Sequence, residues 1–318
     1  MDLSLDAASE RTHDVISAGL EGDAPAGVQV RRVTFEYPNA SHLCWTPSAP
    51  ELSAAASSVS LMMPFVEPYV VRSVHAVLDE LDDDLGEVAR DFGRQELQHH
   101  VQHRRFNDQV RSEVPGTARL ERWMGRTYGW LSRRCSKNFS LAFAAGSETV
   151  AFSIARWTER HSAQLFRDAD PHITTLFMWH LAEEVEHKSV VFDVYRSVDG
   201  SRFRYLRASA LSVALLAMFT TLGSLTMLRA QRRLFNPVAW WRLIVWSVSI
   251  AFEVLPNLFV SASKHHHPGD LADPIMLTTW LSHFDEETGS MPLWWTGAED
   301  GSSVESARSG EAPPFVGS

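Results

Sequence analysis

From about Ser60 onward, apolar residues recur at the three- and four-residue spacing of helices that bury one face. This pattern predicts helices over 63–81, 85–110, 136–164 and 170–198. Asp170 and Pro171 suit the N-cap and first position of the last helix, and Pro64 suits the first turn of the first one. Pro68 is tolerable if that helix begins there. We therefore expect an all-α fold built on a four-helix bundle.

The segments before and after these helices differ in character. The stretch VQVRRVTFEYP alternates apolar and polar residues, which predicts a short strand or an extended arm. Both ends of the chain look poorly ordered, and the C-terminal stretch GAEDGSSVESARSGEAPPFVGS is rich in Gly, Ser, Pro and charge, so we expect residues 1–28 and 299–318 to be disordered. The arm and the bundle then occupy 29–200, and an apolar helical hairpin with a C-terminal region occupies 201–298.

The hairpin is predicted from two long apolar segments. No charge occurs from Ala208 to Leu228, which is long enough to span a bilayer, and the segment 238–260 carries only Arg242 and Glu253. Arginines flank both ends of the first segment, so the positive-inside rule gives no orientation. We expect these helices to cover the bundle or to lie against a membrane surface through 208–260. A two-span anchor is the alternative.

Composition narrows the class of protein. The chain has 318 residues, of which 45% are hydrophobic and 21% charged, as in a globular protein with a sizeable core. Its net charge of −10 and the lack of a long basic block exclude nucleic acid as an expected partner. Cys44 and Cys135 form neither a disulfide framework nor a zinc pattern, and the acidic start MDLSLDAASER does not resemble a secretory signal. We expect a cytoplasmic protein.

Two Glu-x-x-His motifs, each preceded by a lone glutamate, carry the candidate chemistry. Residues three apart lie on one face of a helix, so four helices can direct this set at one point in a bundle core. Such a set is typical of a carboxylate-bridged pair of iron or manganese ions. One Glu-x-x-His motif is weak evidence, since a solvated helix face gives it by chance. Here the order of a lone glutamate followed by Glu-x-x-His occurs two times along the chain. The predicted ligands are Glu67, Glu96, His99, Glu148, Glu184 and His187.

The surroundings of these residues support a metal. Glu148 lies in the apolar run FSLAFAAGSETVAFSIA, where an isolated carboxylate needs a cation or a hydrogen-bonded partner. His103 and His180 lie one turn from the motifs on the same faces. Three roles are open for each of them: a third nitrogen ligand, a residue that orients a carboxylate, or a hydrogen-bonded core histidine. His100, Glu183 and Glu186 lie off the ligand faces, and we expect them not to be ligands.

With these motifs, the chain resembles the family described as predicted metal-dependent hydrolases, within the ferritin-like superfamily. The resemblance rests on VSLMMPFVEPYVVRSV, FGRQELQHHVQH, AGSETVAFSIA and WHLAEEVEHKSVVFDVY, and on HHHPGD followed by Trp280. One departure is that Val66 precedes Glu67 where the family suggests glycine. The resemblance implies a ferritin-like bundle and, from the family's name, hydrolysis, while its ligand pattern is similar to that of di-iron oxygenases and oxidases.

Three functions remain open from the sequence. Carboxylate and imidazole ligands suit iron and manganese, and bridging glutamates can hold two ions close together, so the first is a di-iron oxidase or oxygenase. It would use O2 on a hydrophobic small molecule and receive electrons from a separate reductase, because flavin and nicotinamide fingerprints are not evident. The second is a two-metal hydrolase of an ester or amide. The third is a metal-binding, membrane-associated protein without enzymatic activity.

Overall fold

The structure, a computed structural model, describes residues 28–37, 43–263 and 265–294. The terminal segments expected to be disordered therefore fall almost entirely outside the described residues. Within the described ranges the ordered elements are helices and no strand occurs, which confirms the all-α prediction. Cys44 and Cys135 are both free thiols. The α-helices are α2 (Pro50–His75), α3 (Asp83–Glu113), α4 (Thr117–Arg134), α5 (Lys137–Leu165), α6 (Pro171–Val198), α7 (Arg202–Ala230), α8 (Pro237–Ser261) and α9 (Ile275–Leu281).

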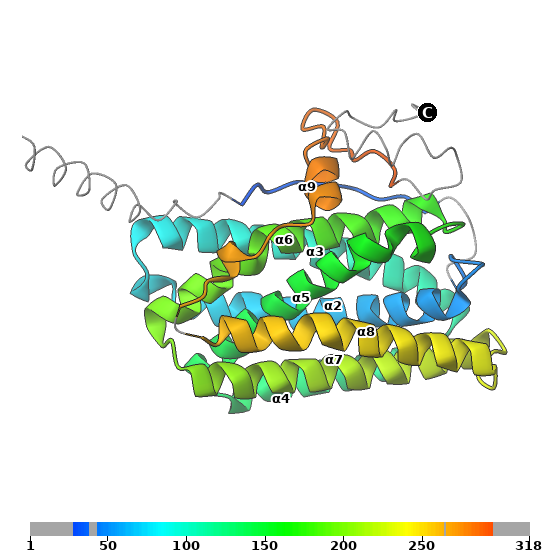
Figure 1. Ribbon diagram of the computed structural model, residues 1–318, viewed down its shortest axis with the longest axis horizontal. Coiled ribbons are helices and arrows are strands. Elements are labelled where there is room, and N and C mark those ends of the chain that lie inside the picture. The colour runs from blue at the N-terminus through cyan, green and yellow to red at the C-terminus, as the bar shows by residue number, and fades with distance from the viewer. Residues whose placement is uncertain (1–27, 38–42, 264, 295–318) are drawn as a thin grey trace, which may run out of the picture.

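Four long helices form the bundle that the sequence predicts. Helix α2 packs against α3 and α5, and α6 completes the ring by packing against the same two helices (Figure 1). Helix α6 begins as expected, because the Asp170 carboxylate accepts hydrogen bonds from the backbone N–H groups of His172 and Ile173. Each helix of the ring carries part of the predicted ligand set.

Helix α2 begins and ends earlier than the expected range 63–81. Its first turns hold small residues, including Ser53, Ala54, Ser57 and Ser58, which are all buried. The serines among them favour caps and turns when helix propensity alone is considered. Here they let another backbone approach closely, since Ser58 faces Gly223 of α7. Tertiary packing extends the helix towards its N-terminus.

Pro64 and Pro68 lie inside α2, not at its start as we expected. A proline within a helix removes one backbone hydrogen bond and leaves the carbonyl four residues earlier without its partner. For Pro64 that carbonyl belongs to Ser60, and it accepts a hydrogen bond of 2.8 Å from the Asn107 side-chain amide. The interior proline is therefore compensated by the neighbouring helix α3.

Helix α4 was not among the predicted elements. It buries Leu120, Met124, Tyr128 and Leu131, which follow one another at intervals of three or four residues. Pro115 lies just before the helix. The periodic signal was therefore present in the sequence, and α4 covers the outer side of α2.

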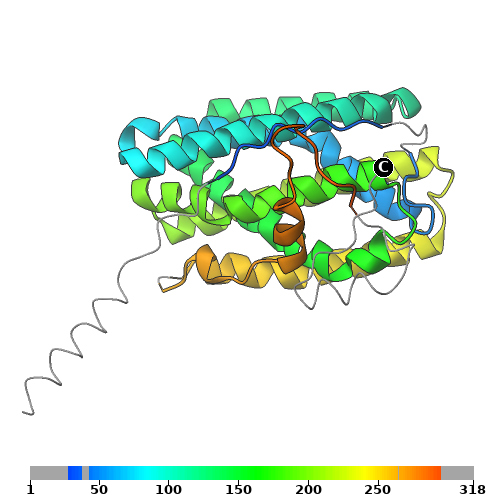
Figure 2. The same ribbon diagram turned by 90° about the horizontal axis from the view of Figure 1, so that it is seen from above.

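Residues 28–37 form an extended arm and not a strand. Arg31, Val33 and Phe35 point into the protein and alternate with exposed neighbours, as the alternating pattern predicts. The Gln102 side chain donates to the Val33 carbonyl at 2.6 Å and accepts from the Phe35 N–H at 3.4 Å. Amide side chains of α3 thus take the place of strand pairing where the arm crosses α3 and α6 (Figure 2).

Helices α7 and α8 cover the bundle. Helix α7 packs against α2 and α5, and α8 packs against α5. Helices α7 and α8, together with the segment Pro50–Glu80 that contains α2, are long and apolar enough to cross a membrane by length and composition. The Pro50–Glu80 segment is largely buried inside the protein, whereas α8 is largely exposed. The predicted apolar hairpin is therefore present, and of its two helices α8 exposes the larger share of its surface.

Candidate metal centre

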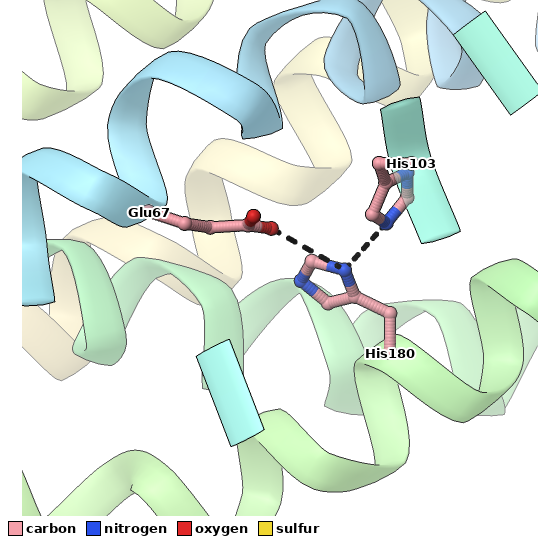
Figure 3. Close-up of side chains that lie close together, drawn as sticks. All are labelled: Glu67, His103 and His180. Carbon is pink, nitrogen blue, oxygen red and sulfur yellow. Dashed lines mark hydrogen bonds and ion pairs between the residues drawn. The ribbon is translucent and has the colours of Figure 1, made fainter. Parts of the chain in front are cut away.

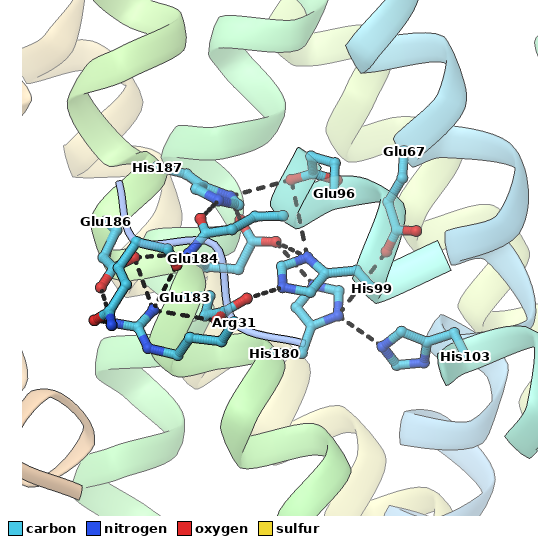
Figure 4. A network of polar contacts seen from close by, with 12 residues as sticks. Arg31, Glu67, Glu96, His99, His103, His180, Glu183, Glu184, Glu186 and His187 are labelled. Atoms are coloured by element: carbon cyan, nitrogen blue, oxygen red, sulfur yellow. Dashed lines mark hydrogen bonds and ion pairs between the residues drawn. The ribbon is translucent and has the colours of Figure 1, made fainter. Parts of the chain in front are cut away.

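The structure brings all six predicted ligand residues together in the bundle core. Helices α2 and α5 each supply one glutamate, and α3 and α6 each supply a Glu-x-x-His pair, of which several are drawn in Figure 4. Every one of the six is buried, and none exposes more than 4% of its surface. The six residues are Glu67, Glu96, His99, Glu148, Glu184 and His187.

The two imidazoles of this set present the same ring atom to the carboxylates. Nδ1 of His187 lies 3.1 Å from Oε1 of Glu96, and 3.6 Å from one oxygen each of Glu148 and Glu184. Nδ1 of His99 lies 3.9 Å from the same Glu96 oxygen and 3.8 Å from Oε1 of Glu184. Glu96 and Glu184 therefore lie close to both imidazoles, where each could bridge two ions.

These distances fit ligands arranged around cations. Ligand atoms bound at about 2.1 Å to one ion lie about 3–4 Å apart. Several buried atoms of the set also lack any hydrogen-bond partner, namely Nδ1 of both histidines, both oxygens of Glu67, and one oxygen each of Glu148 and Glu184. Four glutamates with two neutral histidines would balance two divalent ions in charge. The residues present thus fit a two-metal centre.

Without a cation, the carboxylates compete for protons. Burial, together with the neighbouring carboxylates, raises the pKa of Glu67 and of Glu148 well above the usual value, and burial also raises the pKa of Glu96. Burial acts the same way on Glu184, but the neighbouring imidazoles of His180 and His187 outweigh it and hold the pKa of Glu184 low. Bound cations would replace these protons.

Two residues outside the predicted set hold the imidazoles in place. On the ring edge away from the carboxylates, Nε2 of His187 lies 2.6 Å from the Gln95 amide oxygen, and Nε2 of His99 lies 2.9 Å from Glu183. Both contacts place a proton on Nε2, which turns Nδ1 towards the carboxylates. Burial lowers the pKa of His99, whereas at His187 three carboxylates outweigh burial and raise the pKa, so a bound cation would take the place of the Nδ1 proton there. The sequence predicted that Glu183 is not a ligand, but it did not predict that Glu183 and Gln95 orient the two imidazoles.

The arm supplies a buried cation behind Glu183. Arg31 pairs with Glu183 at 3.2 Å and with Glu186 at 2.8 Å, and Gln95 donates a hydrogen bond to Glu186. Burial raises the pKa of Glu183 to about 8, although the charge of Arg31 opposes this change. Glu183 and Glu186 lie away from the carboxylate cluster. Their sequence signal was two extra acidic residues beside the second motif.

His180 and His103 extend the cluster on the side of α2 (Figure 3). Nε2 of His180 lies 2.8 Å from Glu184, and its Nδ1 lies 2.6 Å from Nε2 of His103 and 3.9 Å from Glu67. The other nitrogen of His103 contacts the Ser60 hydroxyl at 2.8 Å. His180 is therefore next to the carboxylates, whereas His103 contacts His180 on the side away from Glu184.

A cavity of about 120 Å³ adjoins the cluster. Glu67, Glu96, Glu148 and Glu184 contribute to its wall, and most of the remaining wall is apolar, including Met63. A second cavity of about 610 Å³ lies between the bundle and helices α7 and α8, and His180 lines both cavities. A volume of this size is typical of small-molecule sites. The carboxylate cluster is thus next to space for an apolar ligand.

The fold and the cluster define a helical-bundle protein with a buried site suited to two metal ions. The family model for predicted metal-dependent hydrolases matches residues 29–272, and the chain belongs to this family. This confirms the family resemblance. Searches of curated proteins and of solved structures gave no match. Metal dependence therefore agrees between the family and the clustered residues.

Proposed function

We propose that the chain is a two-metal enzyme, with iron as the favoured metal and manganese as the alternative, that uses O2 to oxidise a hydrophobic small molecule. The observation that carries this proposal is the geometry of the buried four-glutamate, two-histidine set. One ion would be held by Glu67, Glu96 and His99, and the other by Glu148, Glu184 and His187. Glu96 and Glu184 would bridge, since each lies within 4 Å of both imidazole Nδ1 atoms. His180 and His103 are further ligand candidates.

The chain's own residues would position and protect this centre. Two iron(II) ions held together supply electrons to O2 when bound. Gln95 and Glu183 orient the two imidazoles through their Nε2 atoms. Apolar side chains such as Val66, Val70 and Val150 line the adjoining cavity and exclude water from it. The electrons would come from a separate reductase.

Hydrolysis is the second candidate, and the family description favours it over oxygen chemistry. The same six residues would hold two ions whose Lewis acidity assists cleavage of an ester or amide. The burial of the site disfavours hydrolysis, because a hydrolytic reaction needs water as a reactant beside the carboxylates. A non-enzymatic, membrane-associated metal protein is the third candidate and would show neither activity.

One experiment separates these candidates. Protein purified without added metal is assayed for metal content, reduced without oxygen, and then exposed to O2 while oxygen uptake and absorption are recorded. About two irons per chain with oxygen uptake support the oxidase proposal. Zinc or manganese, no oxygen uptake and turnover of ester substrates would instead establish the hydrolase. The variant Glu148→Ala should lose metal, whereas Glu87→Ala, which alters an exposed glutamate of α3 outside the cluster, should keep it.

A further inference from the structure

The outer face of α8 is covered with large apolar side chains. Phe252 is 77% exposed and Trp241 is 68% exposed, and the face continues through most of the helix. Helix α8 lies beside α7 along one side of the protein (Figure 1). An exposed apolar face this long marks an interaction surface. Its other large members are Val238, Ile244, Val245, Val248, Leu255, Phe259 and Val260.

The two charged residues of α8 are turned towards the protein. The Arg242 guanidinium lies 2.7 Å from the buried Glu51 carboxylate. Glu253 pairs with Arg156 at 3.4 Å and also with Arg160, both on α5. A helix that faces water directs its charges outward. Helix α8 does the opposite, so its outer face has neither charge nor a pattern of polar groups for a specific protein partner.

Charge around this face complements an anionic lipid surface. The segment 202–261, which spans α7 and α8, contains seven arginines and one glutamate, although the whole chain has a net charge of −10. Arg207, Arg229 and Arg232 are exposed near the ends of the two helices. Arginine beside an apolar helix face binds anionic headgroups while the apolar side chains enter the lipid. In these features α8 resembles a helix that lies in the plane of a bilayer.

The cavity of about 610 Å³ lies directly behind this face. No aspartate, glutamate, lysine or arginine is among its lining residues. Ala217 of α7, and Ile244 and Val248 of α8, line the cavity and are also exposed, which places its mouth between the two helices. Met63 and His180 line both this cavity and the smaller one beside the carboxylates. The route from the outer face to the cluster is therefore lined by uncharged and mostly apolar side chains until it reaches His180.

From these observations we infer that the α7–α8 face lies on a lipid bilayer, and that the cavity behind it takes a long, uncharged alkyl or acyl chain from that bilayer towards the metal site. This inference rests on the proposed function and names its substrate class. A charged headgroup would find no partner within the cavity and would stay at its mouth. The face and the cavity thus act together, because the bilayer that covers the face is also the source of the chain.

The bilayer contact is tested by flotation of the full chain with vesicles of equimolar phosphatidylcholine and phosphatidylglycerol. Wild-type protein should float with these vesicles, and the double variant Phe252→Glu/Phe259→Glu should bind roughly 100-fold more weakly or less, because two charges would enter the lipid. The matched control is Leu97→Glu/Val101→Glu on α3, which alters exposed apolar residues away from this face and should bind as wild type. Absence of vesicle binding, or a discrete dimer joined through this face, would overturn the inference.

The cavity is tested on metal-free protein with 1-bromododecane, which quenches tryptophan on contact. Trp157, Trp240 and Trp246 line the cavity, so wild-type fluorescence should fall and saturate. Ala251→Phe fills the cavity from α8 and should weaken this binding about tenfold or more by removing apolar contact volume. Ala214→Phe, on the exposed side of α7 and outside the cavity lining, should leave it unchanged. Equal, unsaturable quenching in all three proteins contradicts a chain-binding cavity.

These readouts do not depend on metal chemistry. Saturable chain binding without oxygen uptake by the reduced iron protein would reject the proposed oxidase and leave the lipid site intact. Oxygen-dependent turnover of a short, water-soluble substrate without chain binding would reject the lipid site alone.

Discussion

Gln95 holds His187 from the side opposite the carboxylates, with its amide oxygen 2.6 Å from Nε2. The other ring nitrogen, Nδ1, lies 3.1 Å from Glu96. The Gln95 amide group is itself fixed, because its nitrogen donates to the Gln29 carbonyl of the arm and to Glu186. The orientation of a ligand candidate on α6 therefore depends on a neutral residue of α3 and on the arm.

We predict that Gln95→Leu weakens metal binding about 10- to 100-fold, because it removes the hydrogen bond that fixes the ring and its tautomer. Titration of metal-free protein with Mn²⁺ measures the effect. Gln98→Leu, at a half-buried position on the same helix, is the matched control and should bind as wild type. Unchanged affinity in a folded Gln95→Leu variant would show that packing alone orients His187.

The ion pairs of Arg31 give a second prediction. Arg31→Met leaves Glu183, which is fully buried, without its cation. Since Glu183 can take up a proton, we expect a loss of roughly 2–3 kcal/mol in the free energy of unfolding, less than for a buried charge that stays ionised. Metal affinity should fall as well, most clearly above about pH 8. The pKa of Glu183 is already about 8 with Arg31 in place, so without Arg31 this residue would keep its proton to higher pH and be a poorer acceptor for His99.

Denaturant unfolding and metal titration test this pair of effects. Arg32→Met is the control, since Arg32 is the exposed neighbour on the same arm. If both variants have equal stability, the arm contributes nothing through this ion pair.

The sequence predicted the residues of the carboxylate cluster better than the residues that orient its imidazoles. Spacing along helices α3 and α6 is a local property, so Glu96 and His99 could be placed on one face without tertiary information. The lone glutamates followed from their order and from the apolar surroundings of Glu148. Gln95 and Glu183 stand beside ligand candidates in the sequence, yet their roles depend on which neighbouring helix they face. That relationship exists only after the bundle has formed.

The limits of helix α2 show the same dependence for the fold. Its N-terminal half is rich in serine and alanine, and its C-terminal half contains Pro64 and Pro68. The two prolines and, more weakly, the serines disfavour a continuous helix here, although alanine favours one. Packing against α7 and the hydrogen bond from Asn107 to the Ser60 carbonyl supply what local propensity lacks. Helix α4 differs, because the three- and four-residue spacing of its apolar positions is visible in the sequence alone.

Close packing of α7 on α5 leads to a third prediction. A Cβ atom added at Gly146 would lie 2.9 Å from the Cα atom of Ser209, a backbone contact that cannot be relieved by a side-chain rotation. Gly146→Ala should therefore lower the free energy of unfolding by about 1–3 kcal/mol. Gly86→Ala on α3 is the control, since its nearest contact is the flexible Arg90 side chain at 3.5 Å, and it should be neutral or gain up to ~1 kcal/mol. Urea unfolding distinguishes the two, and equal stability would contradict the close helix contact.

The last prediction concerns pH. A carboxyl group whose pKa is higher in the folded than in the unfolded chain stabilises the fold at low pH, and this contribution is lost as pH rises through the folded pKa. Burial places Glu67 and Glu148 in this class, and Glu183, with a pKa of about 8, acts in the same direction. The raised pKa of His187 acts in the same direction as well. The lowered pKa values of His99 and His103 act oppositely, but only up to about their usual value of 6.5.

Above about pH 7 the groups with raised pKa values therefore dominate, and the metal-free protein should lose stability with rising pH, by up to ~1.4 kcal/mol per pH unit for each group that titrates. Protein loaded with Mn²⁺ should change much less, because the cations replace the protons and remain bound as pH rises. The difference in Tm between the two forms should thus widen from about pH 7 to about pH 9. In Glu67→Gln/Glu148→Gln the slope of the metal-free form should be smaller, since neither amide titrates. A metal-free Tm that rises over this interval would mean that the buried carboxylates are already ionised and are balanced by something other than metal.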